Sequence, residues 1–169
     1  MIFVTVGTHE QPFNRLIKYI DQVVEKKIIT DNVFIQTGYS DYHPKFCEYK
    51  PFIPYSQMEE NVKKADIVIT HGGPSSFIMP LQIGKIPIVV PRQKKYGEHV
   101  NDHQVDFARK VNEKYGNLIV IDNIDELGNT IKNYSQIVSA MKAEVLCNNK
   151  NFCEAIESIA QELVGQKNG

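Results

Sequence analysis

The sequence predicts an α/β fold, with a mostly parallel, Rossmann-like sheet and helices on both faces. Short apolar runs alternate with amphipathic stretches along the 169 residues, as in consecutive strand–helix–strand crossovers. The run Ile67–Thr70 contains only aliphatic and β-branched residues, which is typical of a strand covered on both faces. A glycine pair and Pro74 follow it directly, where a helix is expected to begin. The length fits one domain over residues 1–169.

Hydrophobic spacing separates the strands from the helices in the first part of the chain. Leu16, Ile17 and Ile20 recur at helical intervals behind Pro12, which indicates one apolar face of a helix. The expected elements are a strand at Ile2–Val6, a helix from Phe13 to Val24, a strand at Val33–Gln36, a polar loop at Tyr39–Lys50, an extended piece near Phe52 and Ile53, and a small helix at Gln57–Ala65.

The second part of the chain continues the alternation. Asp122 or Asn123 is placed to cap a short helix that contains Leu127 and Ile131. The expected elements are the strand at Ile67–Thr70, a helix after Pro74, a strand at Ile86–Val90, a basic loop at Arg92–Glu98, a helix with one face formed by Val100, Gln104, Phe107, Ala108 and Val111, a strand at Leu118–Ile121, the short capped helix, and a helical C-terminal segment at 135–165, interrupted near 148–151.

Charge and cysteine content exclude several classes of protein. A net charge of −1 gives no broad electrostatic reason to bind nucleic acid. The three cysteines are odd in number and lack a zinc-ribbon or CxxC spacing, so we expect reduced thiols in a cytoplasmic protein. No secretion signal is evident, and no apolar run approaches the roughly twenty residues of a membrane span.

The segment His71–Ser76 has the features of an anion-binding corner. It leaves the strand at a histidine, turns on Gly72 and Gly73, and reaches Pro74 at the expected first helical position. Ser75 and Ser76 add hydroxyl groups beside the free N–H groups and the positive dipole end of the helix. A phosphate or diphosphate is the expected ligand, although an ordinary strand–turn–helix corner has the same local pattern.

Two other polar loops are expected at the same edge of the sheet. In parallel sheets ligands bind beyond the carboxyl ends of the strands, and the loops Gly7–Glu10 and Arg92–Gln104 both begin there. Gly7 and Thr8 can donate to one phosphate while the glycine corner holds the other. Arg92, with Lys94 and Lys95, either adds positive charge to this site or forms a solvated surface cluster.

The segment GEHVNDHQ, which begins at Gly97, allows three interpretations. On a helix His99 and His103 would share a face and could bind a metal, but no third ligand is evident nearby. Alternatively, Asp102, His103 and Gln104 hydrogen-bond a polyhydroxylated ligand such as a sugar. In the third interpretation the first two of these face water and Gln104 lies at a buried edge. We favour the sugar and expect no metal.

Four segments together resemble the donor-binding half of the glycosyltransferase B (GT-B) fold. They are GTH near the amino terminus, ITHGGPSS, GKIPIVVP and NDHQ. The pattern resembles glycosyltransferase family 28, including the small catalytic subunit of the dolichol-linked N-acetylglucosaminyltransferase. It is most similar to short bacterial subunits of capsular and exopolysaccharide synthesis. The resemblance covers most of residues 1–122.

The resemblance implies a UDP-sugar donor, a diphosphate held by loops and helix N-termini without an obligatory metal or other cofactor, and inversion at the anomeric carbon. Gly7 and Thr8 match the first phosphate loop, and Asp102 and Gln104 match positions that hold the donor sugar. Where many members have a ribose-binding glutamate, this chain has Met79, which is either core or evidence that ribose is held differently. The candidate substrate-binding residues are Gly7, Thr8, His71, Gly72, Gly73, Pro74, Ser75, Ser76, Arg92, Glu98, His99, Asp102, His103 and Gln104.

Glycosyl transfer also needs a general base that takes the proton of the acceptor. His9 is the candidate catalytic residue by residue type and loop position. Two alternatives are that His9 contacts phosphate and that the base lies on another polypeptide.

The resemblance further implies that half of the enzyme is supplied by a partner. Similar short subunits pair with a membrane-anchored subunit that receives a lipid-linked saccharide, which would place this chain at the inner face of the membrane. We therefore expect a hexosyltransferase subunit, with UDP-galactose as donor, in capsular or exopolysaccharide synthesis. The alternative is a non-catalytic accessory subunit that enhances a separate transferase by contact. An apolar stripe in segment 135–165 either docks the partner or packs internally; it comprises Phe152, Ala155, Ile156, Ile159 and Leu163.

Overall fold

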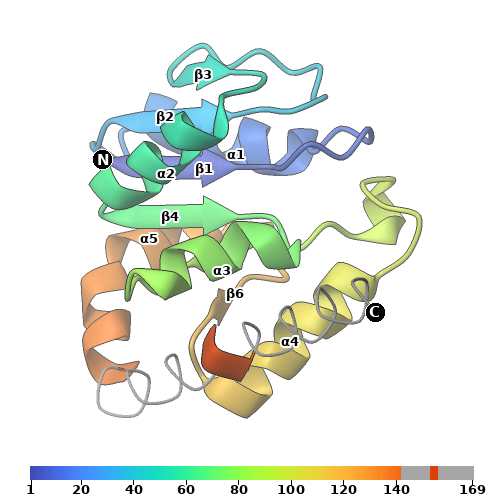
Figure 1. Ribbon diagram of the computed structural model, residues 1–169. Helices are drawn as coiled ribbons and strands as arrows, with labels where there is room; N and C mark the ends of the chain where they lie inside the picture. The colour runs from blue at the N-terminus through green and yellow to red at the C-terminus, as the bar shows by residue number, and fades with distance from the viewer. Residues whose placement is uncertain (142–152, 156–169) are drawn as a thin grey trace.

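The computed structural model describes residues 1–141 and 153–155 of the chain. At its centre is a six-stranded sheet with the order β3-β2-β1-β4-β5-β6, in which all neighbours are parallel (Figure 1). This is the strand order of doubly wound dinucleotide-binding folds. The strands are β1 (Ile2–Thr5), β2 (Val33–Gln36), β3 (Glu48–Lys50), β4 (Ile67–Thr70), β5 (Ile88–Val89) and β6 (Ile119–Val120).

Helices cover both faces of this sheet, as predicted. In Figure 1, α1 and α5 lie behind the sheet, and α2, α3 and α4 lie in front of it. Their bounds are α1 (Asn14–Glu25), α2 (Tyr55–Lys64), α3 (Pro74–Gln82), α4 (His103–Tyr115) and α5 (Leu127–Lys132), with short 3-10 helices η1 (Lys94–Tyr96) and η2 (Ile124–Glu126).

Alternation of side chains along β1 divides the core between these two layers. Val4 packs with Leu16 of α1 in one cluster, whereas Phe3 packs with Val62 of α2 in another. A third cluster joins Phe77 of α3 to Ala108 of α4 over β5. All four residues of β1 are buried as a result, and the strand directs its carboxyl end toward the loops that carry the predicted site.

Strand β3 was not predicted. It lies at the edge of the sheet, within the stretch Tyr39–Lys50 that was expected to be a loop, and pairs with β2 from Phe34↔Glu48 to Gln36↔Lys50. The residues of β3 are exposed or half-buried, so no apolar pattern marks the strand in the sequence. The extended piece expected near Phe52 and Ile53 follows β3 and is not part of the sheet.

Helix α4 begins later than predicted. Its first residue is His103, and Val100, which was expected on its buried face, lies before the helix and is 66% exposed. The chain turns at Gly97, which has φ +69°, a value that favours glycine. Asp102 then accepts a hydrogen bond from the Lys94 N–H at 2.8 Å, so the segment closes on itself instead of extending the helix.

After β6, the described residues agree with the elements predicted from the sequence. Asn123, rather than Asp122, caps the 3-10 helix η2 that leads into α5, and its side-chain oxygen accepts from the Asp125 N–H at 3.2 Å; α5 itself has Glu126 at its N-cap and no side-chain cap. Residues 134–141 and 153–155 are helical. The predicted interruption at 148–151 and the apolar stripe, apart from the exposed Ala155, lie outside the described residues. No helix in the described ranges is both long and apolar enough to cross a membrane.

The carboxylate of Asp21, on α1, holds the irregular loop before β3 against this helix through hydrogen bonds. Asp21 is 2% exposed and accepts hydrogen bonds from the Phe46 N–H at 2.8 Å, the Lys45 N–H at 3.0 Å and the Tyr42 hydroxyl at 2.7 Å. Burial alone would raise the pKa of Asp21, but these hydrogen bonds outweigh burial and hold the pKa below its ordinary value. The same contact raises the pKa of Tyr42 to about 12.

Replacing Asp21 by asparagine is expected to destabilise the protein by about 1–3 kcal/mol at pH 7, the range for hydrogen bonds to a buried charged group. Because the pKa of Asp21 is lowered in the folded state, the carboxylate stabilises the fold above its unfolded pKa of about 3.9. This contribution is lost as the pH falls through the folded pKa. Urea denaturation should therefore show a difference in the free energy of unfolding between wild type and Asp21→Asn. This difference should be largest at pH 7 and should decrease as the solution is acidified.

The exposed Asp31 provides the matched control. Asp31→Asn should change the free energy of unfolding by less than about 0.5 kcal/mol. A difference for Asp21→Asn that is absent at pH 7, or that stays constant in acid, would contradict this role of the carboxylate.

Candidate functional site

The candidate site lies at the carboxyl ends of β1 and β4, which are neighbours in the sheet. From β1 the chain crosses to β2 on one side, whereas from β4 it crosses to β5 on the other. Ligands of doubly wound sheets bind at such a switch point, where the loops diverge. Here it brings together the Gly7–Glu10 loop and the His71–Ser76 corner, as the sequence predicted.

The imidazole of His71 is wedged between these two loops. A Cβ atom at Gly7 would lie 2.4 Å from His71 Cε1, and a Cβ atom at Gly73 would lie 2.4 Å from His71 Nε2. Gly7 also has φ +75°. Gly73 has an ordinary φ of −75°, so it is needed for the space beside the ring and not, as we expected, for the turn. Gly72 similarly leaves room for Gln104.

The His71 ring is neutral throughout the physiological pH range. Burial, followed by the nearby charge of Arg92, lowers the pKa of His71 to about 3. The residue is 9% exposed, and its Nδ1 lies 3.3 Å from the Ser76 hydroxyl oxygen. His71 therefore positions the two loops and adds no positive charge to the site.

Helix α3 presents a helix start that no side chain caps. Pro74 occupies the first helical position, and the N-cap Gly73 has no side chain to offer. The Ser76 hydroxyl donates to the Gly73 carbonyl oxygen at 2.7 Å, so it is engaged within the first turn. Ser75 is exposed. Pro74 has no N–H, and the Ser76 N–H donates to the Gly73 carbonyl oxygen at 3.1 Å, so an anion at this start would meet the Ser75 N–H and the positive end of the helix dipole.

Two pockets adjoin the start of α3. We name the first, of about 470 Å³, the α2–α3 pocket; its walls are Thr5, Gly7, Thr8, His9, Gln36, Tyr55, Met58, Val62, His71, Ser75, Ser76, Met79 and Gln104. We name the second, of about 640 Å³, the α4 pocket; its walls are Gly72, Gly73, Pro74, His99, His103, Gln104, Asp106, Phe107 and Lys110. Gln104 is common to both. Volumes of this order suit small-molecule ligands.

The sequence did not identify the wall that α2 contributes. Tyr55, Met58 and Val62 lie on one side of α2 and line the α2–α3 pocket. Their spacing at three and four residues is a signal of one helical face, but no prediction was based on it, and this helix was expected to start at Gln57, after Tyr55. Met79, opposite them on α3, lines the same pocket and also packs on the cluster of Phe3.

Arg92 lies beneath the site and not on its surface. It is 1% exposed, and its guanidinium donates to the carbonyl oxygens of Val6 at 2.9 Å, Gln11 at 2.7 Å and Glu98 at 3.1 Å. The guanidinium carbon, Cζ, also lies over the ring of Phe13, 4.9 Å from the ring centroid, in a cation–π contact. Burial lowers the pKa of Arg92 to about 10, so the side chain stays charged at neutral pH. Lys94 and Lys95 are exposed and separate from it.

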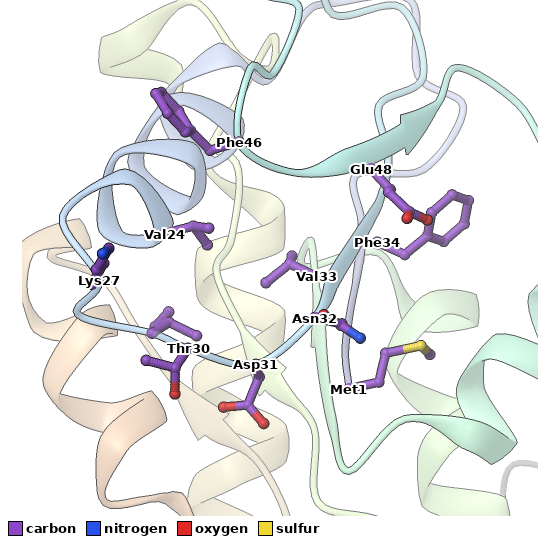
Figure 2. Close-up of a pocket in the computed structure, with 11 residues that line it drawn as sticks. Met1, Val24, Lys27, Thr30, Asp31, Asn32, Val33, Phe34, Phe46 and Glu48 are labelled. Carbon is purple, nitrogen blue, oxygen red and sulfur yellow. The ribbon is translucent and has the colours of Figure 1, made fainter.

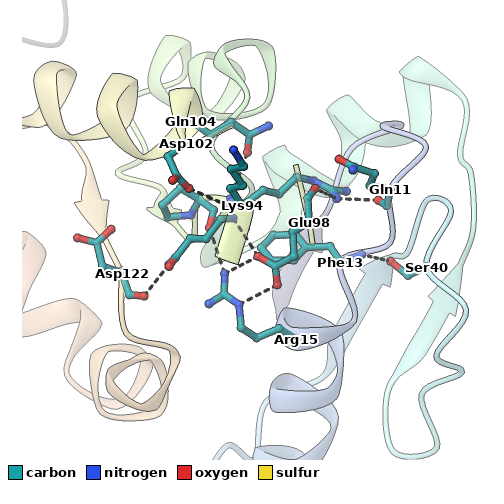
Figure 3. Close-up of polar contacts among 12 residues, drawn as sticks. Gln11, Phe13, Arg15, Ser40, Lys94, Glu98, Asp102, Gln104 and Asp122 are labelled. Carbon is teal, nitrogen blue, oxygen red and sulfur yellow. Dashed lines mark hydrogen bonds and ion pairs between the residues drawn. The ribbon is translucent and has the colours of Figure 1, made fainter. Parts of the chain in front are cut away.

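Glu98 is engaged in the same internal network. Figure 3 shows Arg15 directed at its carboxylate, with bonds of 2.8 Å from Nε and 2.9 Å from Nη2. The Gln93 N–H donates to Glu98 at 3.0 Å, and the carboxylate side chain is 4% exposed. Contact of Glu98 or Arg92 with a ligand stays a prediction, because the contacts described for both are within the protein.

The polar residues around the start of α4 reach the pockets to different extents. His103 and Gln104 line the α4 pocket, whereas Asp102 is exposed beside it as the N-cap residue. Gln104 accepts from the Arg92 N–H at 3.2 Å, which leaves its amide N–H groups as donors. His99 precedes the helix, so it does not share a helical face with His103. Among the described residues, no three His, Cys, Asp or Glu side chains are grouped as metal ligands.

A further pocket, of about 560 Å³, lies at the opposite ends of the strands. Figure 2 shows Met1, Asn32 and Val33, at the amino ends of β1 and β2, on its walls. Asp31, Glu48 and Lys27 also line it, so one cation stands against two carboxylates that would repel a phosphate. This pocket lacks the helix start and the donor-bearing loops of the carboxyl edge.

Comparison with known proteins identifies a matching family and solved structures with a similar fold. A family model described as the glycosyltransferase family 28 C-terminal domain matches residues 1–162. The chain is similar to a solved structure described as the glycotransferase of kitacinnamycin, with a TM-score of 0.56 and 16% identity over 93% of this chain and 42% of the other. It is similar to MurG of Acinetobacter baumannii, with a TM-score of 0.56 and 15% identity over 92% of this chain and 49% of the other.

These likenesses confirm the predicted fold class, a Rossmann-like α/β sheet of the kind found in one half of GT-B glycosyltransferases. The chain spans less than half the length of either solved structure, with coverages of 42% and 49%. Among curated proteins, none matches the chain.

Replacing Gly73 by alanine is expected to destabilise the protein through the His71 ring. The new Cβ atom would lie 2.4 Å from Nε2, so the ring or the corner must move, at a cost of about 2–3 kcal/mol. In the His71→Ala background the ring is gone, and the same change should cost about 1 kcal/mol or less. Chemical denaturation of wild type, both single variants and the double variant measures this coupling. If Gly73→Ala destabilised the wild-type protein and the His71→Ala variant equally, the His71 ring would not be what requires glycine at position 73.

Proposed function

Because the chain belongs to the glycosyltransferase family 28 C-terminal domain family, we propose that it is the donor-binding half of a glycosyltransferase and binds a UDP-sugar. The observation that carries the proposal is the uncapped start of α3, placed between two pockets at the β1/β4 switch point. The diphosphate lies at this helix start, where the Ser75 N–H and the helix dipole stabilise negative charge. Thr8, exposed on the facing loop, supplies a second set of donors.

The two pockets suit the two ends of such a donor. The α2–α3 pocket has apolar walls in Met58, Val62 and Met79, with Tyr55 beside them, and takes the uridine. The α4 pocket, with the polar side chains of His103 and Gln104, takes the sugar. None of the residues lining the α2–α3 pocket is Asp or Glu, so the ribose hydroxyls meet neutral groups only.

In the proposed reaction, the acceptor hydroxyl attacks the anomeric carbon of the donor sugar from the face opposite UDP. The bond from the anomeric carbon to the β-phosphate oxygen breaks, UDP leaves, and the configuration inverts. Donors aimed at the diphosphate accelerate this step because the negative charge on the leaving group grows in the transition state. A general base takes the hydroxyl proton, and no metal is required for departure of UDP.

The remaining half of the enzyme comes, in this proposal, from a second polypeptide. The chain covers 42% and 49% of the two similar structures, and the proposal concerns the part of the enzyme beyond this coverage. We propose a membrane-anchored partner subunit that holds a lipid-linked saccharide at the cytoplasmic face of the membrane. The donor to test first is UDP-galactose, and the proposed product is an intermediate of capsular or exopolysaccharide synthesis.

One observation favours a second candidate, a non-catalytic accessory subunit. Met79 occupies the pocket position where many members of the family have a ribose-binding glutamate, which removes one contact to the nucleotide. An accessory subunit would not need to bind UDP, so the binding experiment below separates the two candidates.

Isothermal titration calorimetry of the full chain with UDP tests the donor site. We expect one UDP to bind per chain and Ser75→Asp to weaken binding tenfold or more. A carboxylate at the second position of α3 would repel the diphosphate. Without a ligand, the same carboxylate interacts favourably with the helix dipole and stabilises the protein by about 0.3–1 kcal/mol. The variant should therefore be at least as stable as wild type while binding UDP less well.

Ser56 provides the matched control, because it is also exposed and also occupies the second position of a helix, α2. Ser56→Asp should leave UDP affinity within threefold of wild type. A chain that binds no UDP, or that binds it equally well with Ser75→Asp, would remove the proposed donor site.

A further inference from the structure

His9 and His99 lie ring against ring where the two pockets meet. Their ring centroids are 4.8 Å apart and the ring planes are inclined by 39°. His9, in the loop after β1, lines the α2–α3 pocket, and His99, in the loop after β5, lines the α4 pocket. Ser75 and Pro74, in the first turn of α3, line the same two pockets. The histidine pair therefore borders the place proposed for the diphosphate.

Both rings use Nδ1 in the same way. The Gln11 N–H donates to His9 Nδ1 at 3.2 Å, and the Asn101 N–H donates to His99 Nδ1 at 3.4 Å. A ring nitrogen that accepts a hydrogen bond uses its lone pair and carries no proton. In the neutral ring the proton must then be on Nε2. Turning either ring over would set a C–H group against the backbone N–H and lose the bond.

This tautomer limits what His9 can do in the reaction. A general base needs a free lone pair, and the only lone pair of the neutral ring is already bound to the Gln11 N–H. Protonation at Nδ1 would break the bond that shapes the loop after β1. The group that remains available is the Nε2–H, which is a donor. Phosphate oxygens, unlike an acceptor hydroxyl that must lose its proton, are suitable partners for a donor.

Electrostatics around His9 favour the neutral ring. Burial, followed by the charges of His99 and Arg92, lowers the pKa of His9, and Glu10 acts in the opposite direction. A neutral ring donates one hydrogen bond from Nε2 without bringing a charge to be neutralised.

We propose that His9 and His99 are paired Nε2–H donors to the diphosphate of the bound nucleotide, and that His9 is not the general base. This inference rests on the proposed function, because it takes the UDP site as given. It assigns the proton of the acceptor to a group other than these two histidines.

The tautomer can be tested without any ligand. Long-range ¹H–¹⁵N correlation spectra of the full chain labelled at histidine, assigned with His9→Gln and His99→Gln, report which nitrogen is protonated. At pH 7.5 we expect Nε2–H for both rings. A His9 or His99 ring protonated at Nδ1 would overturn the proposal.

Paired substitutions test the donor role in UDP binding. Glutamine places an amide N–H near the position of histidine Nε2 but cannot serve as a base, whereas alanine provides neither. We expect His9→Ala and His99→Ala to weaken UDP binding about tenfold, and His9→Gln and His99→Gln to stay within threefold of wild type. The control is His43→Gln, because His43 is exposed in the loop before β3 and lines neither pocket.

The outcomes separate this inference from the proposed function. If wild type binds UDP and Ser75→Asp weakens binding, but His9→Ala binds as tightly as wild type, the donor site stands and the histidine pair is removed from it. If His9→Gln loses as much affinity as His9→Ala, the Nε2–H is not the group that matters, and the proposal is overturned. If wild type binds no UDP, both fail together.

Discussion

The buried guanidinium of Arg92 is the interaction on which the candidate site depends. It is 1% exposed and reaches the carbonyl oxygens of Val6, Gln11 and Glu98. A buried charge is costly unless it is hydrogen-bonded, so the end of β1, the following loop and the loop after β5 must remain where their carbonyl groups meet it. Arg15 also holds the loop after β5, because it donates to the carboxylate of Glu98. The edge of the sheet is thus organised before any ligand arrives.

A consequence is that neither Arg92 nor His71 presents positive charge at the proposed diphosphate position. His71 has a pKa of about 3 and acts as a wedge between Gly7 and Gly73. The charge of Arg92 is directed at backbone carbonyl groups beneath the site. At the place proposed for the diphosphate are the start of α3 and the exposed Thr8 and Ser75, whereas the charged side chains on the walls, Asp106 and Lys110, belong to the α4 pocket. Fixed neutral donors and a helix dipole stabilise developing negative charge without having to reorganise, which is what the proposed departure of UDP needs.

The fold was largely predictable because most strands are buried on both faces. The strands Val33–Gln36 and Ile67–Thr70 have the predicted bounds, since their apolar runs are long enough to be distinct. Strand β3 was missed because backbone pairing with β2, not burial, fixes Glu48–Lys50. In the site, the converging loops followed from sheet topology. The burial of Arg92 did not, because its partner Val6 is 86 residues away in the sequence and backbone carbonyl groups leave no sequence signal.

The central claim is that the start of α3 at the β1/β4 switch point holds the diphosphate of a nucleotide. The most direct test is a crystal structure of the full chain with UDP. The account predicts both phosphorus atoms at the first turn of α3, between Ser75 and the loop that carries Thr8, with the uracil in the α2–α3 pocket. Phosphorus density in the pocket at the amino ends of β1 and β2 (Figure 2), with the start of α3 empty, would contradict it.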